Sequence, residues 1–115
     1  MKSIDIVALP QFEKEILQLS KKYPSIEKDF ENLLTKLQNN PFSGDALGNN
    51  CYKVRMKIAS KQSGKRGGAR VIACVKIIEH RLFLVSIYDK SERETITKKE
   101  MEFIFWKRVV YCNET

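Results

Sequence analysis

Residues 51–58 read CYKVRMKI. The apolar residues Val54, Met56 and Ile58 of this stretch alternate with cationic residues, so the two kinds of side chain point to opposite faces of an extended chain. One face is suited to a hydrophobic core, and the other is wholly cationic. The alternation predicts a half-buried β-strand over residues 52–58.

Two further strands are predicted over residues 70–78 and 82–89, separated by a tight turn at residues 79–81. The polar, glycine-rich residues 60–68 are expected to form a mobile loop before the first of them. Strands joined in this way pair antiparallel. The sides expected to meet carry Arg70, Ile72, Cys74 and Lys76 on one strand and Leu84, Ser86, Tyr88 and Lys90 on the other, with Phe83, Val85 and Ile87 on the opposite side.

The first half of the chain has a different periodicity. Residues 4–9 predict a short strand, which Pro10 closes. Apolar residues then recur at helical spacing, first at Phe12, Ile16 and Leu19, and again between the break at residues 23–25 and the Asn-Asn-Pro sequence at residues 39–41. We expect a hairpin of two helices, followed by a loop over residues 42–50.

The last predicted element is a helix over residues 98–110. Thr97 and Glu100 have the spacing of a capping box, and an apolar stripe follows them. Together these elements predict an α+β domain spanning residues 1–115. Its architecture is a twisted antiparallel sheet of about four strands, with two N-terminal helices packed on one face and a C-terminal helix.

Composition narrows the function classes. No apolar run approaches the roughly 20 residues of a membrane helix, and the first residues have no pattern of a secretion signal. We therefore expect a cytoplasmic protein. Its three cysteines, Cys51, Cys74 and Cys112, are expected to be reduced thiols, since their number and spacing suggest neither a disulfide framework nor a zinc site. The single histidine, His80, is expected in a solvated turn.

The net charge of +7 comes from one segment. Residues 51–78 contain eight basic residues and no acidic one, whereas the rest of the chain has thirteen basic and fourteen acidic residues. A surface patch of one sign is typical of a protein that binds a polyanion. Nucleic acid is the first candidate partner, and an acidic protein is the second.

If the strands pair as predicted, cationic side chains and a tyrosine gather on one face of the sheet. Arginine can clamp a phosphate through two parallel hydrogen bonds, and lysine or tyrosine can transfer protons. This pattern alone leaves three interpretations open: catalysis on a phosphodiester, binding without catalysis, and a solvated surface. Asp89 and Glu92 do not make a metal site without further carboxylates, and residues 64–68 lack the spacing of a nucleotide-binding loop. We expect no metal and no cofactor.

Two stretches carry a family resemblance: GKRGGARVI at residues 64–72 and LVSIYDKSE at residues 84–92, together with Lys53-Val54-Arg55. They resemble the RelE/ParE superfamily of toxins from toxin–antitoxin systems, with the HigB-like branch as the nearest. The resemblance covers nearly the whole chain. It implies a twisted antiparallel sheet with two helices on one side and a C-terminal helix beside the active surface.

Ribonuclease members of that superfamily cut messenger RNA on the ribosome without a metal ion, using the 2′-hydroxyl of the RNA as the nucleophile. The resemblance therefore implies a ribosome-dependent endoribonuclease (mRNA interferase) that inhibits translation. Arg70 would clamp the phosphate, Lys57 or Lys90 would act as base or charge stabiliser, and Tyr88 would stack on a base or transfer a proton. The candidate catalytic set is Arg55, Lys57, Arg70, Tyr88 and Lys90, and the candidate ribosome-binding set is Lys53, Lys61, Lys65, Arg66 and Lys76.

Other members of the superfamily poison DNA gyrase and lack the basic catalytic set, so a gyrase inhibitor is the first alternative function. A binding module for RNA or an acidic protein, without catalysis, is the second. The resemblance also implies an acidic antitoxin partner, expected to be a HigA-like protein with a helix-turn-helix part. This sequence departs from related toxins in having Ala73 and Cys74 where aromatic residues are frequent. That difference weakens the expectation of base stacking on this strand.

Overall fold

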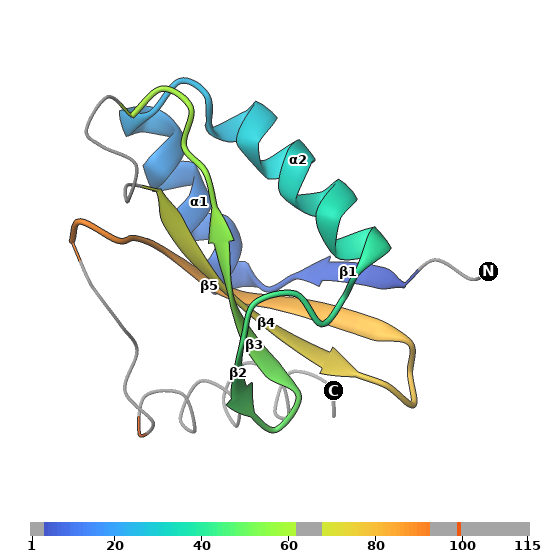
Figure 1. The fold of residues 1–115 in the computed structure, drawn as a ribbon. Helices are drawn as coiled ribbons and strands as arrows, with labels where there is room; N and C mark the ends of the chain where they lie inside the picture. Colours follow the sequence, from blue (N-terminus) through green and yellow to red (C-terminus); the bar gives the residue numbers. More distant parts are fainter. Residues whose placement is uncertain (1–3, 62–67, 93–98, 100–115) are drawn as a thin grey trace.

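The computed structural model describes residues 4–61, 68–92 and 99. Two helices lie over one face of a five-stranded sheet (Figure 1). In chain order the elements are β1 (Asp5–Ala8), α1 (Pro10–Lys22), α2 (Ile26–Asn39), β2 (Asp45–Gly48), β3 (Cys51–Met56), β4 (Ala69–Lys76) and β5 (Arg81–Asp89). The α+β class and the helical hairpin are confirmed. The predicted helix over residues 98–110 falls almost wholly outside the described residues.

The sheet has the order β1-β5-β4-β3-β2, and this corrects the expectation of about four antiparallel strands. β1 pairs with β5 in parallel, with Asp5 opposite Arg81. The other neighbouring strands pair antiparallel. β2 occupies part of the region expected to be a loop, where Asp45 pairs with Lys53. A four-residue strand containing glycine has too little alternation to be recognised from its own sequence.

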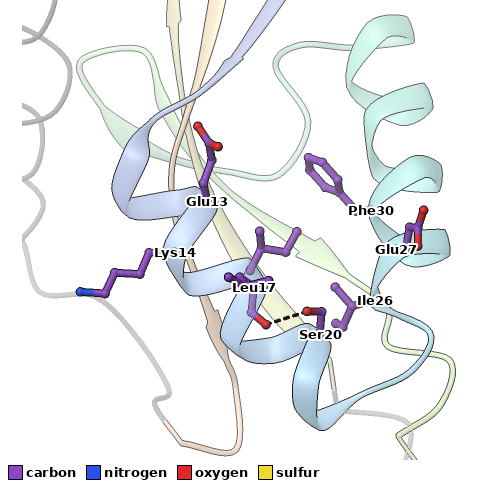
Figure 2. A pocket seen from close by; sticks show the side chains of 8 residues that line it. Glu13, Lys14, Leu17, Ser20, Ile26, Glu27 and Phe30 are labelled. Carbon is purple, nitrogen blue, oxygen red and sulfur yellow. Dashed lines mark hydrogen bonds between the residues drawn. The ribbon is translucent and has the colours of Figure 1, made fainter.

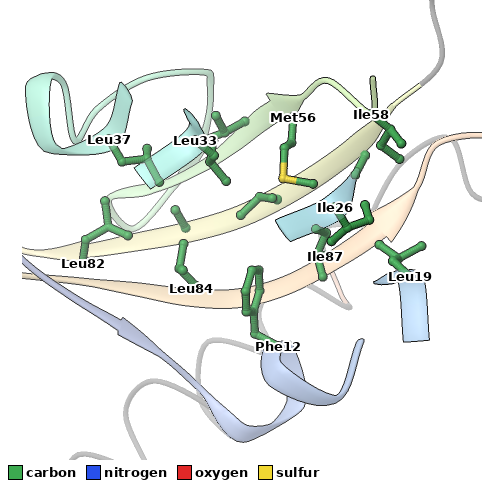
Figure 3. Packing of buried hydrophobic residues seen from close by; sticks show 14 of the residues in the cluster. Phe12, Leu19, Ile26, Leu33, Leu37, Met56, Ile58, Leu82, Leu84 and Ile87 are labelled. Atoms are coloured by element: carbon green, nitrogen blue, oxygen red, sulfur yellow. The ribbon is translucent and has the colours of Figure 1, made fainter. Parts of the chain in front are cut away.

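Both helices begin where the sequence predicts. Pro10 takes the first position of α1, where its missing N–H costs nothing, and α1 ends with Lys21 and Lys22 in its last turn, where cations are favoured. The helices cover the sheet with a core that includes Phe12, Leu33 and Leu37 (Figure 3). From the sheet, Val54, Met56 and Ile58 enter the same core, as their alternation predicts.

A bulge shifts the alternation of β5. The register slips between Ile72 and Ala73, which face Ser86 and Leu84 respectively, so one residue of β5 is extra. Leu84 therefore packs in the core under the helices, as does Ile87, whereas Phe83 and Val85 pack on the other face with Tyr88. The expected grouping of Leu84 with Tyr88 is wrong for this reason, as is that of Phe83 and Val85 with Ile87.

The expectation of three reduced thiols is also wrong for two of them. Cys51 and Cys74 are direct partners in the β3–β4 register and form a disulfide. Both are buried on the sheet face away from the helices. Their separation of 23 residues gave no sign of this pairing, because only the register places them opposite each other. Cys112 lies outside the described residues.

No described helix combines the length and apolar character needed to cross a bilayer. Each is a short amphipathic helix with charged residues on its outer side.

Candidate functional site

Three of the predicted site residues form one row across the sheet. Arg55 on β3 is the direct partner of Arg70 on β4, and Arg70 is the direct partner of Tyr88 on β5. Directly paired residues project from the same side of a sheet, with their Cβ atoms about 4.5–5.5 Å apart. Ile72 and Tyr88 belong to the cluster on the face away from the helices, and strand alternation puts Arg70 there with them. The structure therefore brings two guanidinium groups and a phenol together on this face.

The other two predicted catalytic residues extend this arrangement by one row. Lys57 follows β3 and is exposed between the buried Met56 and Ile58, so it continues the alternation of Arg55. Lys90 follows β5, and its backbone N–H donates to the carbonyl of Gly68 over 3.0 Å. Gly68 in turn lies against Met56 and Lys57. Lys57 and Lys90 thus flank Gly68 at the end of the sheet where Arg70 lies.

Gly68 is required by this close approach. Its φ of 125° lies in the region that residues with a side chain rarely adopt, and a Cβ atom there would stand 2.8 Å from the carbonyl oxygen of Met56. Any side chain would force β3 and β4 apart beside Arg70. We call the five positions Arg55, Lys57, Arg70, Tyr88 and Lys90 the cationic row-end.

Arg70 is buried, with 6% of its surface exposed. Its Nη1 donates to the carbonyl oxygen of Ala69 over 3.1 Å. Burial lowers the pKa of Arg70, and the nearby charge of Arg55 lowers it further, while Tyr88 and Asp45 act in the opposite direction. A guanidinium remains charged through such a change. Two cations held this close, one of them desolvated, favour an anion between them.

Lys61 does not lie in an exposed loop as expected. Its Nζ donates to Oδ1 of Asp89 over 2.6 Å, and only 8% of its side chain is exposed. A lysine whose ammonium is occupied in a buried ion pair is not available to grip ribosomal RNA. This placement removes Lys61 from the candidate ribosome-binding set.

The remaining members of that set have different positions. Lys53 is half-buried and stands one row beyond Arg55 on the same strand face, opposite Ile72. Lys76 lies at the other end of β4, six residues and about 20 Å from Arg70, where it pairs with Glu79 over 3.4 Å. Lys65 and Arg66 lie outside the described residues. Lys53 is thus the described member next to the cationic row-end.

Asp89, which the sequence suggested only as an insufficient metal ligand, is a structural centre of the fold. Its carboxylate is fully buried and accepts hydrogen bonds from Tyr23, Lys61 and Ser91. Burial by itself would raise the pKa of Asp89, but these hydrogen bonds outweigh it and hold the pKa well below its ordinary value. A signal was present, because Asp89 occupies a core-facing phase of its strand, where an acid requires a cationic partner.

Glu15 was missed as well. From α1 its Oε1 accepts a hydrogen bond from the Ser86 hydroxyl over 2.9 Å and a longer one from the Ile87 N–H over 3.4 Å. β1 ends opposite Leu84, so Glu15 takes over as hydrogen-bond partner where the parallel strand stops. This contact fixes α1 against the part of β5 that leads to Tyr88.

A groove of about 630 Å³ lies on the helical side of the molecule, between α1 and α2 (Figure 2). Apolar residues, among them Ile16, Leu17 and Phe30, line most of it, and Lys14 is its one cation. The groove is separated from the cationic row-end by the sheet and its core. Elsewhere in the described part of the chain, no three His, Cys, Asp or Glu side chains come together as metal ligands do.

Comparisons with known proteins bear on the family and the fold of this chain. Residues 13–109 match the family model described as the RelE toxin of the RelE/RelB toxin–antitoxin system. Among solved structures, a mutant of the Escherichia coli toxin RelE in its free state is similar, with a TM-score of 0.58 and 17% sequence identity. That similarity covers 81% of this chain and 90% of the other. At this identity the structural match supports the fold alone.

Proposed function

This chain belongs to the RelE toxin family of toxin–antitoxin systems, and we propose that it inhibits translation by cutting messenger RNA on the ribosome. The cut is made by attack of the RNA's own 2′-hydroxyl on the adjacent phosphorus. The 5′-oxygen leaves, so the products are a cyclic phosphate and a 5′-hydroxyl. Such a reaction needs a group that holds the phosphate, a proton acceptor at the 2′-oxygen and a proton donor at the 5′-oxygen.

The observation that carries the proposal is the Arg55–Arg70–Tyr88 row. Phosphoryl transfer adds negative charge at the phosphate in the transition state, and cations fixed in advance stabilise that charge without reorganising. Arg70 is held in place by burial and by its hydrogen bond to Ala69, so it meets the requirement for a fixed clamp. Arg55, exposed at its side, is assigned to the incoming RNA backbone.

The proton transfers are assigned to the remaining residues of the cationic row-end. Lys57 or Lys90 accepts the proton of the 2′-hydroxyl or stabilises the charge, and Tyr88 either donates a proton or stacks on a base. These residues flank the phosphate site proposed at Arg70, from the two strand ends on either side of Gly68. Lys53, Lys65, Arg66 and Lys76 are proposed to contact ribosomal RNA.

Mapping of transcript 5′ ends after induced expression in bacteria tests the proposal. We expect growth arrest and new 5′ ends within translated regions, and ribosomes programmed with one message should be cut by the purified protein at the same positions. Naked message should be cut far more slowly. Intact message together with accumulated gyrase–DNA cleavage complexes would instead identify a gyrase poison, and unimpaired growth would identify a binding module without catalysis.

A RelE-family toxin is paired with an antitoxin, and we propose that the partner here is acidic and carries a HigA-like helix-turn-helix part. The net charge of +7 favours association with an acidic protein, mainly by raising the association rate. Co-expression with the neighbouring gene, followed by affinity purification, should recover a complex and restore growth. A chain that is toxic with every neighbouring gene present would contradict this proposal.

A further inference from the structure

A buried polar cluster lies directly behind the cationic row-end. Asp89 is the last residue of β5, and none of its side chain is exposed. Its Oδ1 accepts from Lys61 Nζ over 2.6 Å and from the N–H and hydroxyl of Ser91 over 2.9 and 2.8 Å. Its Oδ2 accepts from the Tyr23 hydroxyl over 2.6 Å. A buried carboxylate with four such donors is fully satisfied, so its position is closely fixed.

The donors come from three separate segments. Tyr23 follows the C-terminus of α1, Lys61 follows β3, and Ser91 follows β5. The Lys61 ammonium also lies 5.8 Å from the centre of the Tyr23 ring. Asp89 therefore ties the helix layer and the ends of two strands to one point.

These are the strand ends that carry the candidate catalytic side chains. Asp89 sits between Tyr88 and Lys90 in the chain, and strand alternation directs Tyr88 to the opposite face of the sheet. Lys61 anchors the chain four residues after Lys57. On the other side, the Lys90 N–H donates to Gly68, two residues before Arg70.

From this arrangement we infer that Asp89 is a positioning residue for RNA cleavage: with Lys61 and Tyr23 as its partners, it fixes the backbone from which Tyr88 and Lys90 meet the RNA. The inference rests on the proposed function. It assigns Lys61 a role through Asp89 instead of a direct contact with ribosomal RNA. Small displacements of reacting groups are enough to make this role measurable, since an error of about 1 Å can cost about a hundredfold in rate.

Asp89→Asn is the decisive variant, because it keeps the size of the side chain and removes its charge. Single-turnover cleavage on saturating programmed ribosomes should fall by about ten- to a hundredfold, while the affinity for the ribosome changes by less than about twofold. Leu37→Ala is the matched control, since Leu37 is fully buried in the core at the far end of the sheet, near Leu82 (Figure 3). Assayed well below its melting temperature, Leu37→Ala should cut ribosome-bound message at the parental rate.

Lys61→Met and Lys61→Arg separate the two roles of that residue. Under the inference, Lys61→Met lowers the cleavage rate at unchanged ribosome affinity, Lys61→Arg restores much of it, and combining Lys61→Met with Asp89→Asn costs little more than either change alone. A Lys61→Met variant that loses ribosome affinity and keeps its rate once bound would overturn the inference. Tyr23→Phe, which removes one hydroxyl, provides the same test if Asp89→Asn fails to fold.

Amide hydrogen exchange measured by NMR tests the positioning without any cleavage assay. In Asp89→Asn the Lys90 amide, which donates to Gly68, should exchange about tenfold faster or more. The Val75 amide donates to Asn50 over 2.9 Å at the other end of β4 and should change by less than about twofold. Unchanged exchange at Lys90 would contradict the inference even if the parental protein proves not to cut RNA. If the parental protein does not cut RNA but the Lys90 amide of Asp89→Asn still exchanges faster, the proposed function is refuted and the structural role of Asp89 stands.

Discussion

The two ends of the β4–β5 hairpin differ in how far their charged side chains are exposed to solvent. At the turn, Glu79 pairs with Lys76 over 3.4 Å and with Arg81 over 3.6 Å, and all three side chains keep contact with water. At the other end, Arg70 is 6% exposed and the carboxylate of Asp89 is fully buried. Charges withdrawn from water cost folding free energy, so a protein retains them where they serve a purpose. This difference supports the proposal that the Arg70–Asp89 end carries the functional site, whereas the charged side chains at the turn are solvated.

The largest expected difference between the two ends concerns Asp89→Ala. Removing this carboxylate leaves the Lys61 ammonium buried without its partner, which should lower the free energy of unfolding by about 3–5 kcal/mol. Urea denaturation followed by circular dichroism measures the change. A loss below about 1 kcal/mol would mean that the pair is solvated, as the surface pairs at the turn are.

Near the turn a disulfide joins β3 to β4, whereas the buried Lys61–Asp89 ion pair stabilises the other end of the sheet. The Cys51–Cys74 disulfide spans 23 residues, so reducing it should lower the free energy of unfolding by about 3 kcal/mol. Urea unfolding with and without dithiothreitol measures this difference. A variant carrying both Cys51→Ser and Cys74→Ser is the control, and its stability should not respond to the reductant.

Acid should weaken the Asp89 end first. Because the folded-state pKa of Asp89 is held below its ordinary value, the stabilisation is present above about pH 4, the range of an unfolded carboxyl, and is lost as the pH falls. Its contribution to the loss should be about 1 kcal/mol by pH 3. Parental protein and Asp89→Asn should therefore converge in stability between pH 6 and pH 3, as followed by thermal melts. Parallel curves would show that the shift is absent.

The smallest effect is expected at the turn. Glu79→Ala removes both exposed ion pairs there, and such pairs contribute little because water and salt screen them. The free energy of unfolding should stay within about 0.5 kcal/mol of the parental value. The same urea series measures this change. A larger loss of free energy of unfolding would show that the ion pairs at the turn contribute as the buried ones do.

The parts of this molecule that follow a local period were predictable from its sequence. Val54, Met56 and Ile58 face the core because alternation demands it, and Pro10 starts α1 because only the first helical turn accepts it. That Arg55, Arg70 and Tyr88 share one face of the sheet also followed from alternation, whereas their direct pairing depends on the registers of three strands. The predictable features thus depend on the period of a single element.

The features that escaped prediction depend on pairing between distant segments. β1 reaches β5 across the two helices, and the bulge opposite Ile72 changes the phase of β5 without any glycine or proline to mark it. The Cys51–Cys74 bond requires the exact β3–β4 register. Lys61 looked like a loop cation because its partner Asp89 is 28 residues away, and only the folded chain brings the two together.

Single-turnover cleavage by Arg70→Ala tests whether the sheet face that carries Arg70 cuts RNA. The variant should fold, with a stability loss of about 1–2 kcal/mol from the packing of its buried stem, and its cleavage of ribosome-bound message should fall by about a hundred- to a thousandfold. Arg70→Lys should remain strongly impaired, since lysine keeps the charge and lacks the two-pronged donor geometry. A folded Arg70→Ala protein that cuts ribosome-bound message at the parental rate would contradict the assignment of this face as the catalytic surface.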